Sequence, residues 1–385
     1  MNYNRHLVLL LISSILYAGP ELQFEKTPNG GLQPQVIVDK AGTIHLLYYK
    51  GKAREGDIFY VTRAKGKSAF SSPLKVNSIA NSACCIGSIY RARMAIGKNG
   101  IVHVIWNGSF GYVKKQWEKK GKKRSPEEFT FLFYSRLSAN KKSFTKQVNL
   151  NHESHGLDGN GSIIVDNKGM VSVFWHADIK GKSGRRVFQV RSTNGGKSFS
   201  KEIALDVEQL GVCECCTLEA FTSAKAISYI MYRTANKKNR DAIIYSFDGS
   251  RKPVKYTRLN RHAWAITHCP ASSFSFAEDS KAVHAAWETE DSVYTKNLMS
   301  KSKAVKVSIK SKRAKYPSLA INKKGERLLS WSAEPNWGVG GFIQYRITDK
   351  NNKVLAQSYN KGHSPVGYSF SAACALPSGK FIIFY

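Results

Sequence analysis

The segment SIIVDNKGMVSVFW at residues 162–175 decides the fold. On both sides of the turn Asp166–Gly169, β-branched and aromatic residues dominate, with the alternation of period two that is typical of a β-hairpin. A hairpin of the same kind recurs along the chain. The seven copies are residues 34–49, 93–106, 162–175, 218–232, 273–287, 318–331 and 371–385.

Six of the seven hairpins are followed by an outer pair of strands, for example residues 57–77 and 187–205. Repeated four-stranded units stack well as a propeller, because each blade buries its faces on its neighbours. We therefore predict an all-β fold with one domain over residues 19–385, a β-propeller of four-stranded antiparallel blades, with seven blades favoured over six. The last copy ends after two strands, which predicts that residues 21–27 add an outer strand to the final blade. No segment shows a helical period.

The N-terminus predicts export. Residues 7–18 (LVLLLISSILYA) form an apolar run of 12 residues that ends just before Gly19-Pro20. A membrane-spanning helix needs about 20 apolar residues, so this run is typical of a signal peptide over residues 1–18. We expect a secreted or periplasmic protein without a transmembrane anchor.

The charge favours an acidic partner. The chain of 385 residues has 59 Lys and Arg against 27 Asp and Glu, a formal net charge of +32. With 42% hydrophobic and 22% charged residues, it is not a disordered polycation. For an exported chain we rank an acidic glycan above nucleic acid as the partner. The sequence carries no indication of oligomeric state and no zinc-protease, nucleotide-binding or serine-nucleophile motif.

One turn resembles a known repeat motif. Residues 192–199 (STNGGKSF) are similar to the Asp box of sialidase-type β-propellers, with Asn194 in place of the Asp and Phe199 in place of the Trp. In such a turn Gly supplies a positive φ and a polar side chain binds backbone amides. The resemblance implies a sialidase-like propeller fold and does not by itself imply catalysis.

The first repeat extends the resemblance. Arg54 and Asp57 match an Arg and an Asp that follow the second strand of the opening blade in sialidases. The resemblance implies that Arg54 binds substrate and that Asp57 is the general acid. Gln33 stands where sialidases have the first arginine of a three-arginine clamp on the substrate carboxylate, and this departure argues against sialic acid itself.

Later repeats supply the other matches. Tyr368, in the segment Gly-Tyr-Ser that starts the last hairpin, resembles the sialidase nucleophile. Glu214 and Arg233 resemble its catalytic Glu and the second clamp arginine. The resemblance implies Glu214 as the base for Tyr368, as in a family that forms a covalent glycosyl intermediate. Arg313 is the candidate for the third clamp arginine by its position.

These matches give two functional hypotheses. The first is an exo-acting glycoside hydrolase, or a lyase-like enzyme, acting on an acidic glycan that is sialylated, uronic or sulfated. The second is a non-catalytic propeller that binds a glycan, or binds a metal ion through Cys and His residues. We expect the two to differ in whether Tyr368, Glu214 and Arg233 point into one pocket.

The cysteines form a second candidate site. Six of the seven lie in loops that lead into the first strand of a repeat, and the segments Cys213-Glu-Cys215-Cys216 and His268-Cys269 stand out. A Cys-x-Cys-Cys segment also resembles a group of bacterial sialidase-like propellers. Disulfides are favoured in an exported chain, and the odd number leaves at least one thiol unpaired. The alternative is a Cu or Zn site of thiolates and imidazoles. No other cofactor is implied.

Overall fold

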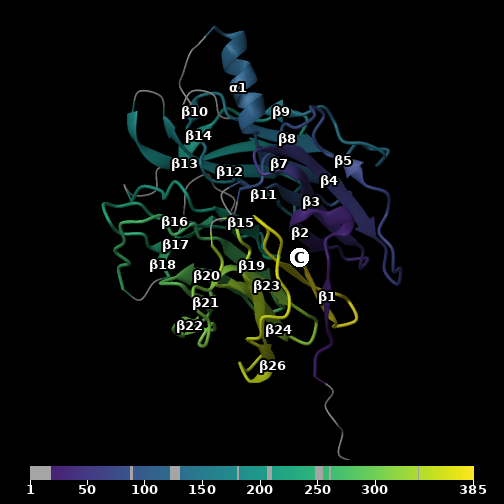
Figure 1. The fold of residues 1–385 in the computed structure, drawn as a ribbon, viewed down its shortest axis with the longest axis vertical. Helices are drawn as coiled ribbons and strands as arrows, with labels where there is room; N and C mark the ends of the chain where they lie inside the picture. Colours follow the sequence, from purple (N-terminus) through teal and green to yellow (C-terminus); the bar gives the residue numbers. More distant parts are fainter. Residues whose placement is uncertain are drawn as a thin grey trace, which may run out of the picture.

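Seven β-sheets follow one another around a central channel (Figure 1). The computed structural model describes residues 19–86, 90–121, 131–179, 182–205, 210–247, 255–259, 262–336 and 338–385. The predicted signal peptide, residues 1–18, lies outside the described residues. The prediction of a seven-bladed propeller is confirmed.

The first three blades begin with the hairpins predicted from the sequence. Blade 1 contains β2 (Leu32–Val38), β3 (Ile44–Lys52), β4 (Glu55–Arg63) and β5 (Leu74–Lys75). Blade 2 contains β6 (Arg93–Ile96), β7 (Val102–Asn107), β8 (Leu132–Arg136) and β9 (Val148–Asn149). Blade 3 contains β11 (Ser162–Val165), β12 (Val171–Ile179), β13 (Lys182–Ser192) and β14 (Ile203–Leu205), with β10 (Ser154–His155) also paired to β12.

The next three blades repeat this order. Blade 4 contains β15 (Glu219–Thr222), β16 (Ser228–Arg233), β17 (Ala242–Phe247) and β18 (Lys255–Arg258). Blade 5 contains β19 (Phe274–Glu278), β20 (Val283–Thr289), β21 (Ser292–Asn297) and β22 (Val305–Lys306). Blade 6 contains β23 (Lys315–Ile321), β24 (Arg327–Ala333), β25 (Phe342–Thr348) and β26 (Val354–Ser358).

The two ends of the chain build blade 7 together. It has three strands, in the order β27 (Ala372–Ala375), β28 (Phe381–Phe384) and β1 (Leu22–Glu25). The strand β1 pairs in parallel with β28, and the amide of Thr27 donates to the carbonyl of Tyr385 at 2.6 Å. A short 3₁₀ turn, Pro28–Gly30, then leads into β2. The predicted closure of the ring by the N-terminal strand is confirmed.

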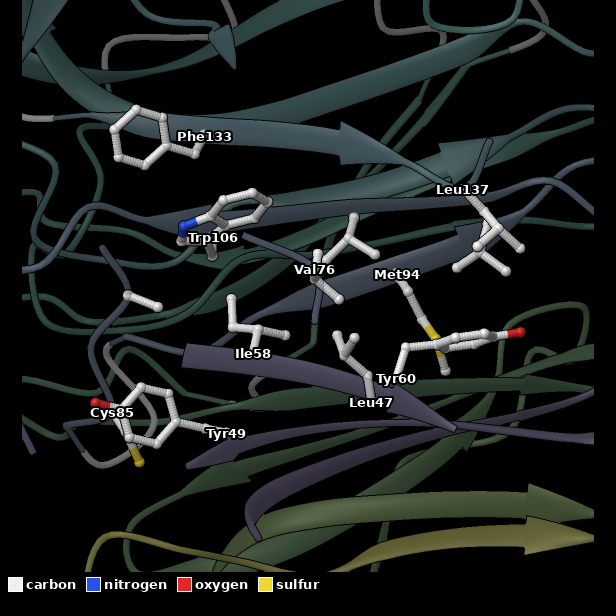
Figure 2. Close-up of a cluster of buried hydrophobic side chains, with 13 residues drawn as sticks. Leu47, Tyr49, Ile58, Tyr60, Val76, Cys85, Met94, Trp106, Phe133 and Leu137 are labelled. Carbon is white, nitrogen blue, oxygen red and sulfur yellow. The ribbon is translucent and has the colours of Figure 1, made fainter. Parts of the chain in front are cut away.

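The core lies between neighbouring blades. Figure 2 shows the cluster between blades 1 and 2, where Leu47 and Ile58 face Met94, Trp106 and Phe133. A fully buried large apolar side chain stabilises the fold by roughly 1.5–3 kcal/mol. Each interface of this kind therefore fixes a blade against the next one, and the channel walls become a rigid frame for side chains.

One helix was not expected. The helix α1 (Phe110–Lys119) lies in the connection between β7 and β8, so the prediction that the chain has no helix is wrong. Its N-cap is Ser109, whose hydroxyl accepts from the amide of Tyr112 at 3.1 Å. Tyr112 packs edge-on against Phe133 of blade 2, with ring centroids 5.2 Å apart. The cap and this one-sided contact support a short helix, in which Phe110, Val113 and Trp117 repeat with helical spacing over only two turns.

The Asp-box-like turn has the local geometry expected of it. The carboxamide of Asn194 accepts from the amides of Lys197 and Ser198 at 3.1 and 3.0 Å. Gly196 has a φ of 80°, and a Cβ there would collide with the Tyr134 hydroxyl. The ring of Phe199 packs edge-on against Tyr134 of blade 2 at 4.8 Å. The turn thus fastens blade 3 to blade 2.

All predicted site residues belong to one end of the ring. Because strands alternate in direction, the loop into each inner strand and the turn between the second and third strands of a blade lie at the same end. We call it the site end. None of the helices in the described ranges is long and apolar enough to cross a membrane.

Candidate functional site

A pocket of about 470 Å³ opens at the site end between blades 5, 6 and 7. Loops into β19, β23 and β27 and the turns β20–β21 and β24–β25 supply its wall. The lining residues are His268, Cys269, Ala271, Asp291, Arg313, Lys315, Tyr316, Pro335, Asn336, Gly338, Val339, Gly367, Tyr368 and Ser369. We call this space the rim pocket.

Tyr368 is half-buried and lines the rim pocket. Gln33 holds its segment from blade 1: the Gln33 side-chain amide donates to the Tyr368 carbonyl at 3.3 Å, and the Gln33 backbone amide donates to the Ser369 hydroxyl at 2.8 Å. A Cβ at Gly338 would lie 3.5 Å from the Tyr368 hydroxyl oxygen. The glycine therefore leaves space beside the phenol, and Gln33 has a structural task at the position where the resemblance to sialidases would place an arginine.

Cationic and acidic side chains share the rim pocket with Tyr368. Arg313 is exposed, and its guanidinium donates to the Pro335 carbonyl at 3.2 Å. Lys315 donates to the Pro270 carbonyl. Asp291 is exposed, and its backbone amide donates to the buried Glu288 at 3.1 Å. The pocket lining can therefore attract an anion, and it contains both a carboxylate and a phenol.

Asp57 and Arg54 lie elsewhere at the site end, in blade 1. The Asp57 carboxylate accepts from the Asn77 side chain at 2.7 Å and the Asn81 amide at 2.8 Å, and it pairs with Lys75 at 2.9 Å. Burial alone would raise the pKa of Asp57, but these three donors outweigh it and lower the pKa. A carboxylate held ionised in this way is poorly suited to donate a proton.

Arg54 is exposed and stacks over the ring of Phe110, with its guanidinium carbon 5.2 Å from the centroid. It belongs to the surface beside α1 and is not part of the rim-pocket wall.

Glu214 and Arg233 are also outside the rim-pocket wall. Glu214 is exposed in the loop before β15. Arg233 is fully buried: it pairs with Glu288, donates to the Arg240 carbonyl at 2.6 Å, and stacks on Trp264 at 4.7 Å. Of the predicted residues, Tyr368, Arg313, His268 and Cys269 line one pocket, and Asp57, Arg54, Glu214 and Arg233 are not part of its lining.

The central channel contains a charged cluster. The channel encloses about 380 Å³ and is lined by all seven inner strands. Glu219, the first residue of β15, pairs with Arg93 and lies 3.4 Å from Arg91. Burial lowers the pKa of Arg91 to about 10, and burial together with repulsion from Arg91 lowers the pKa of Arg93. Two cations share one carboxylate, so the cluster favours a further anion.

Sequence reasoning missed this channel cluster and the pocket residues Asp291, Lys315 and Tyr316. A signal for the cluster exists, because Arg91-Ala-Arg93 and Glu219 put charges at the starts of inner strands that otherwise carry small or apolar residues. The signal for the pocket residues is weak, since Asp291 lies in the turn between β20 and β21, and Lys315 and Tyr316 are the first residues of β23, directly after a loop.

The cysteines of blades 4 and 5 meet behind the rim pocket. Cys215 and Cys269 form a disulfide, and the other five cysteines are free. The sulfurs of Cys213, Cys215 and Cys216 lie within 4.8 Å of one another. Such a set fits a soft metal ion in its donor chemistry, but the disulfide uses one of the three sulfurs. The Cu or Zn site, with His268 as a further ligand, stays a prediction.

The two remaining thiols of this cluster differ in acidity. A hydrogen bond from Cys216, aided by Arg233 and Arg240 and opposed by burial, lowers the pKa of Cys213 to about 7. Burial raises the pKa of Cys216 well above its ordinary value. The remaining free cysteines are buried and do not belong to this cluster. They are Cys84, Cys85 and Cys374.

Known structures share this architecture. No protein-family model matches the chain, and a search of curated proteins finds no match. The chain is similar to an alpha-L-arabinofuranosidase of Fusarium graminearum, with 11% identity, 87% of this chain and 98% of that chain covered, and a TM-score of 0.55. An alpha-L-arabinanase of Penicillium chrysogenum gives 7% identity, coverages of 84% and 94%, and a TM-score of 0.53.

A polysaccharide lyase, an ulvan lyase bound to -[GlcA(1-4)Rha3S]-, is similar with 10% identity, coverages of 90% and 88%, and a TM-score of 0.51. These matches show the fold. At such low identity they assign no residue of this chain to a function.

Proposed function

We propose that this protein is an exported, glycan-active β-propeller that cleaves an acidic glycan in the rim pocket. The observation that carries the proposal is the composition of that pocket, which is lined by Tyr368, Asp291, Arg313 and Lys315 among others. A phenol, a carboxylate and two cations are the groups needed to bind an acidic sugar and to move a proton or form a covalent bond beside it.

Each residue has a role in this proposal. Arg313 and Lys315 bind the acid group of the sugar, for which a guanidinium is well suited. Tyr368 is the nucleophile, as the resemblance to sialidases implies. Asp291 and His268, which line the same pocket, take the acid and base roles in place of Asp57 and Glu214.

Three further observations support an acidic glycan. The net charge of +32 attracts polyanions to the molecule as a whole. The two channel arginines share a single carboxylate and can accept another anion. Among the similar structures, the ulvan lyase has a ligand that contains GlcA, a uronic acid.

The test is turnover by residues 19–385 on a panel of substrates. The panel contains fluorogenic glycosides, sialosides included, and uronic and sulfated polysaccharides. Hydrolysis is measured by the appearance of new reducing ends, and lyase activity by the ultraviolet absorbance of unsaturated uronates. Tyr368→Phe should lose at least about a hundredfold in kcat with little change in binding. Tyr112→Phe, on α1 and outside the pocket, is the matched control and should keep full activity.

The competing function is a non-catalytic glycan binder, which is favoured by the buried state of Arg233 and by the absence of Glu214 from the pocket lining. Folded protein that binds acidic polysaccharides but turns over none of them would establish this second function. Folded protein that neither binds nor cleaves any acidic glycan would overturn the proposal.

A further inference from the structure

Four cysteine sulfurs form a graded set from the surface inward. Cys269 is exposed and lines the rim pocket, and its disulfide partner Cys215 is half-buried. Behind them, Cys213 and Cys216 are free and buried. The Sγ of Cys213 lies 3.7 Å from the Sγ of Cys215, close to van der Waals contact. A free thiol therefore touches one sulfur of an exposed disulfide.

The loop that carries these thiols is fixed on several sides. The Cys213 amide donates to the Arg233 carbonyl at 2.9 Å, and the His176 ring contacts the Cys216 carbonyl at 2.9 Å. The amide of Ser272 donates to the Cys216 sulfur at 3.4 Å. The contact between the free thiol and the disulfide is thus built into the packing of blades 4 and 5.

We propose that Cys213, Cys215, Cys216 and Cys269 form a thiol–disulfide exchange site, in which the disulfide moves between the exposed pair Cys215–Cys269 and the buried pair Cys213–Cys216. The site gives the protein a second chemical activity, exchange with small thiols and disulfides at the rim of the pocket. The proposal does not depend on glycan cleavage.

The reaction balances within the four residues. The Cys213 thiolate attacks the Cys215 sulfur, a Cys213–Cys215 bond forms, and Cys269 leaves as a thiolate that takes up a proton. The Cys216 thiolate then attacks the Cys213 sulfur, and Cys215 leaves and is protonated. One disulfide and two thiols are present before and after. No oxidant is consumed, and the exposed Cys269 thiol becomes available to an external disulfide.

The sequence spacing agrees with this order. Cys213 and Cys216 are three residues apart, the Cys-x-x-Cys spacing at which two thiols of one turn can close a disulfide. Cys215 and Cys269 come from different blades, 54 residues apart, so their exchange opens a covalent link between two blades beside the rim pocket.

The test is alkylation of the native protein at mildly alkaline pH without reductant, followed by peptide mapping. In the wild type, iodoacetamide should label Cys269 progressively, and peptides joined through Cys213 and Cys216 should accumulate. In Cys213→Ser, labelling of Cys269 should be at least about tenfold slower, because the attacking sulfur is absent. Cys374→Ser, a buried thiol in blade 7, is the matched control and should behave as the wild type.

A third variant, Cys216→Ser, separates the two exchange steps. It also keeps the proposal testable if Cys213→Ser does not fold. In Cys216→Ser, Cys269 should still be labelled, but joined Cys213 and Cys216 peptides should be absent. Cys269 that stays unlabelled in the wild type, or is labelled equally in Cys213→Ser, would overturn the proposal. So would one equivalent of bound copper or zinc that protects Cys213 and Cys216 from alkylation.

Discussion

Two groups of buried arginines behave differently in this protein. Arg233, at the boundary of blades 4 and 5, pairs with the carboxylate of Glu288, and both side chains are 0% exposed. Backbone carbonyls and the ring of Trp264 complete its surroundings. In the channel, Arg91 and Arg93 share the single carboxylate of Glu219, beside a cavity of about 380 Å³.

The difference lies in charge balance and free space. Around Arg233 every side is filled by protein, so its charge holds two blades together and is closed to ligands. Around Arg91 and Arg93 the positive charge exceeds the negative charge and space remains beside it. The same residue type is therefore a structural brace in one place and a candidate anion-binding group in the other.

The strongest test of this comparison is Arg233→Met. Removing the guanidinium leaves Glu288 buried without a counter-charge, and we expect the free energy of unfolding to fall by about 3–5 kcal/mol. Denaturant unfolding measures it. The double variant Arg233→Met, Glu288→Gln should recover a large part of the loss. An Arg233→Met protein as stable as the wild type would show that Arg233 is not a brace.

Buried histidines extend the comparison to pH. Burial, and to a lesser degree Arg136, lowers the pKa of His103 to about 4, while the unfolded chain binds the same proton near 6.5. The folded protein is therefore destabilised as pH falls from about 6.5 to 4, by at most about 3 kcal/mol for this residue. Unfolding should become easier across that window. His103→Gln should flatten the slope, and an unchanged slope would contradict the assignment.

The channel arginines should affect binding more than stability. Arg91→Gln and Arg93→Gln should each weaken the binding of an acidic glycan by about 10- to 100-fold, the effect of one charge-assisted hydrogen bond. Neutral glycans should be unaffected, and the free energy of unfolding should not fall by more than about 1 kcal/mol. Isothermal titration calorimetry and unfolding measure both. Lys225→Gln, which removes an exposed charge at the opposite end, is the matched control.

The smallest effect is expected at an exposed ion pair. Lys361 and Glu334 lie 3.1 Å apart at the surface, with side chains 62% and 41% exposed. Lys361→Ala should change the free energy of unfolding by less than about 0.5 kcal/mol, because water screens the pair. A loss comparable to that of Arg233→Met would mean that burial does not set the order of these effects.

Most of the fold could be predicted because its signals are local. Alternation within each hairpin, such as residues 162–175, identified the inner strands of all seven blades, and the missing strands at the C-terminus indicated closure by residues 21–27. The helix α1 was not predicted, because its stability comes from the Ser109 cap and from contact with Phe133, and neither produces a long apolar period in the sequence.

The candidate site was predicted only in part. Tyr368 and Arg313 do line one pocket, and His268 and Cys269 join them there. The sequence could not show that Arg233 is enclosed by Glu288 and Trp264. These partners lie 55 and 31 residues further along the chain, and only the folding of blades 4 and 5 brings them to Arg233.

The sequence by itself determined the all-β propeller, its seven repeats, the closure of the ring and the basic character of the surface. These depend on residue spacing and composition, which are properties of the chain alone. Only the tertiary structure decided that Cys215 pairs with Cys269, that Arg91 and Arg93 share Glu219, and that Tyr368 and Arg313 line one pocket. Those contacts join different blades, and their distances depend on how the ring closes.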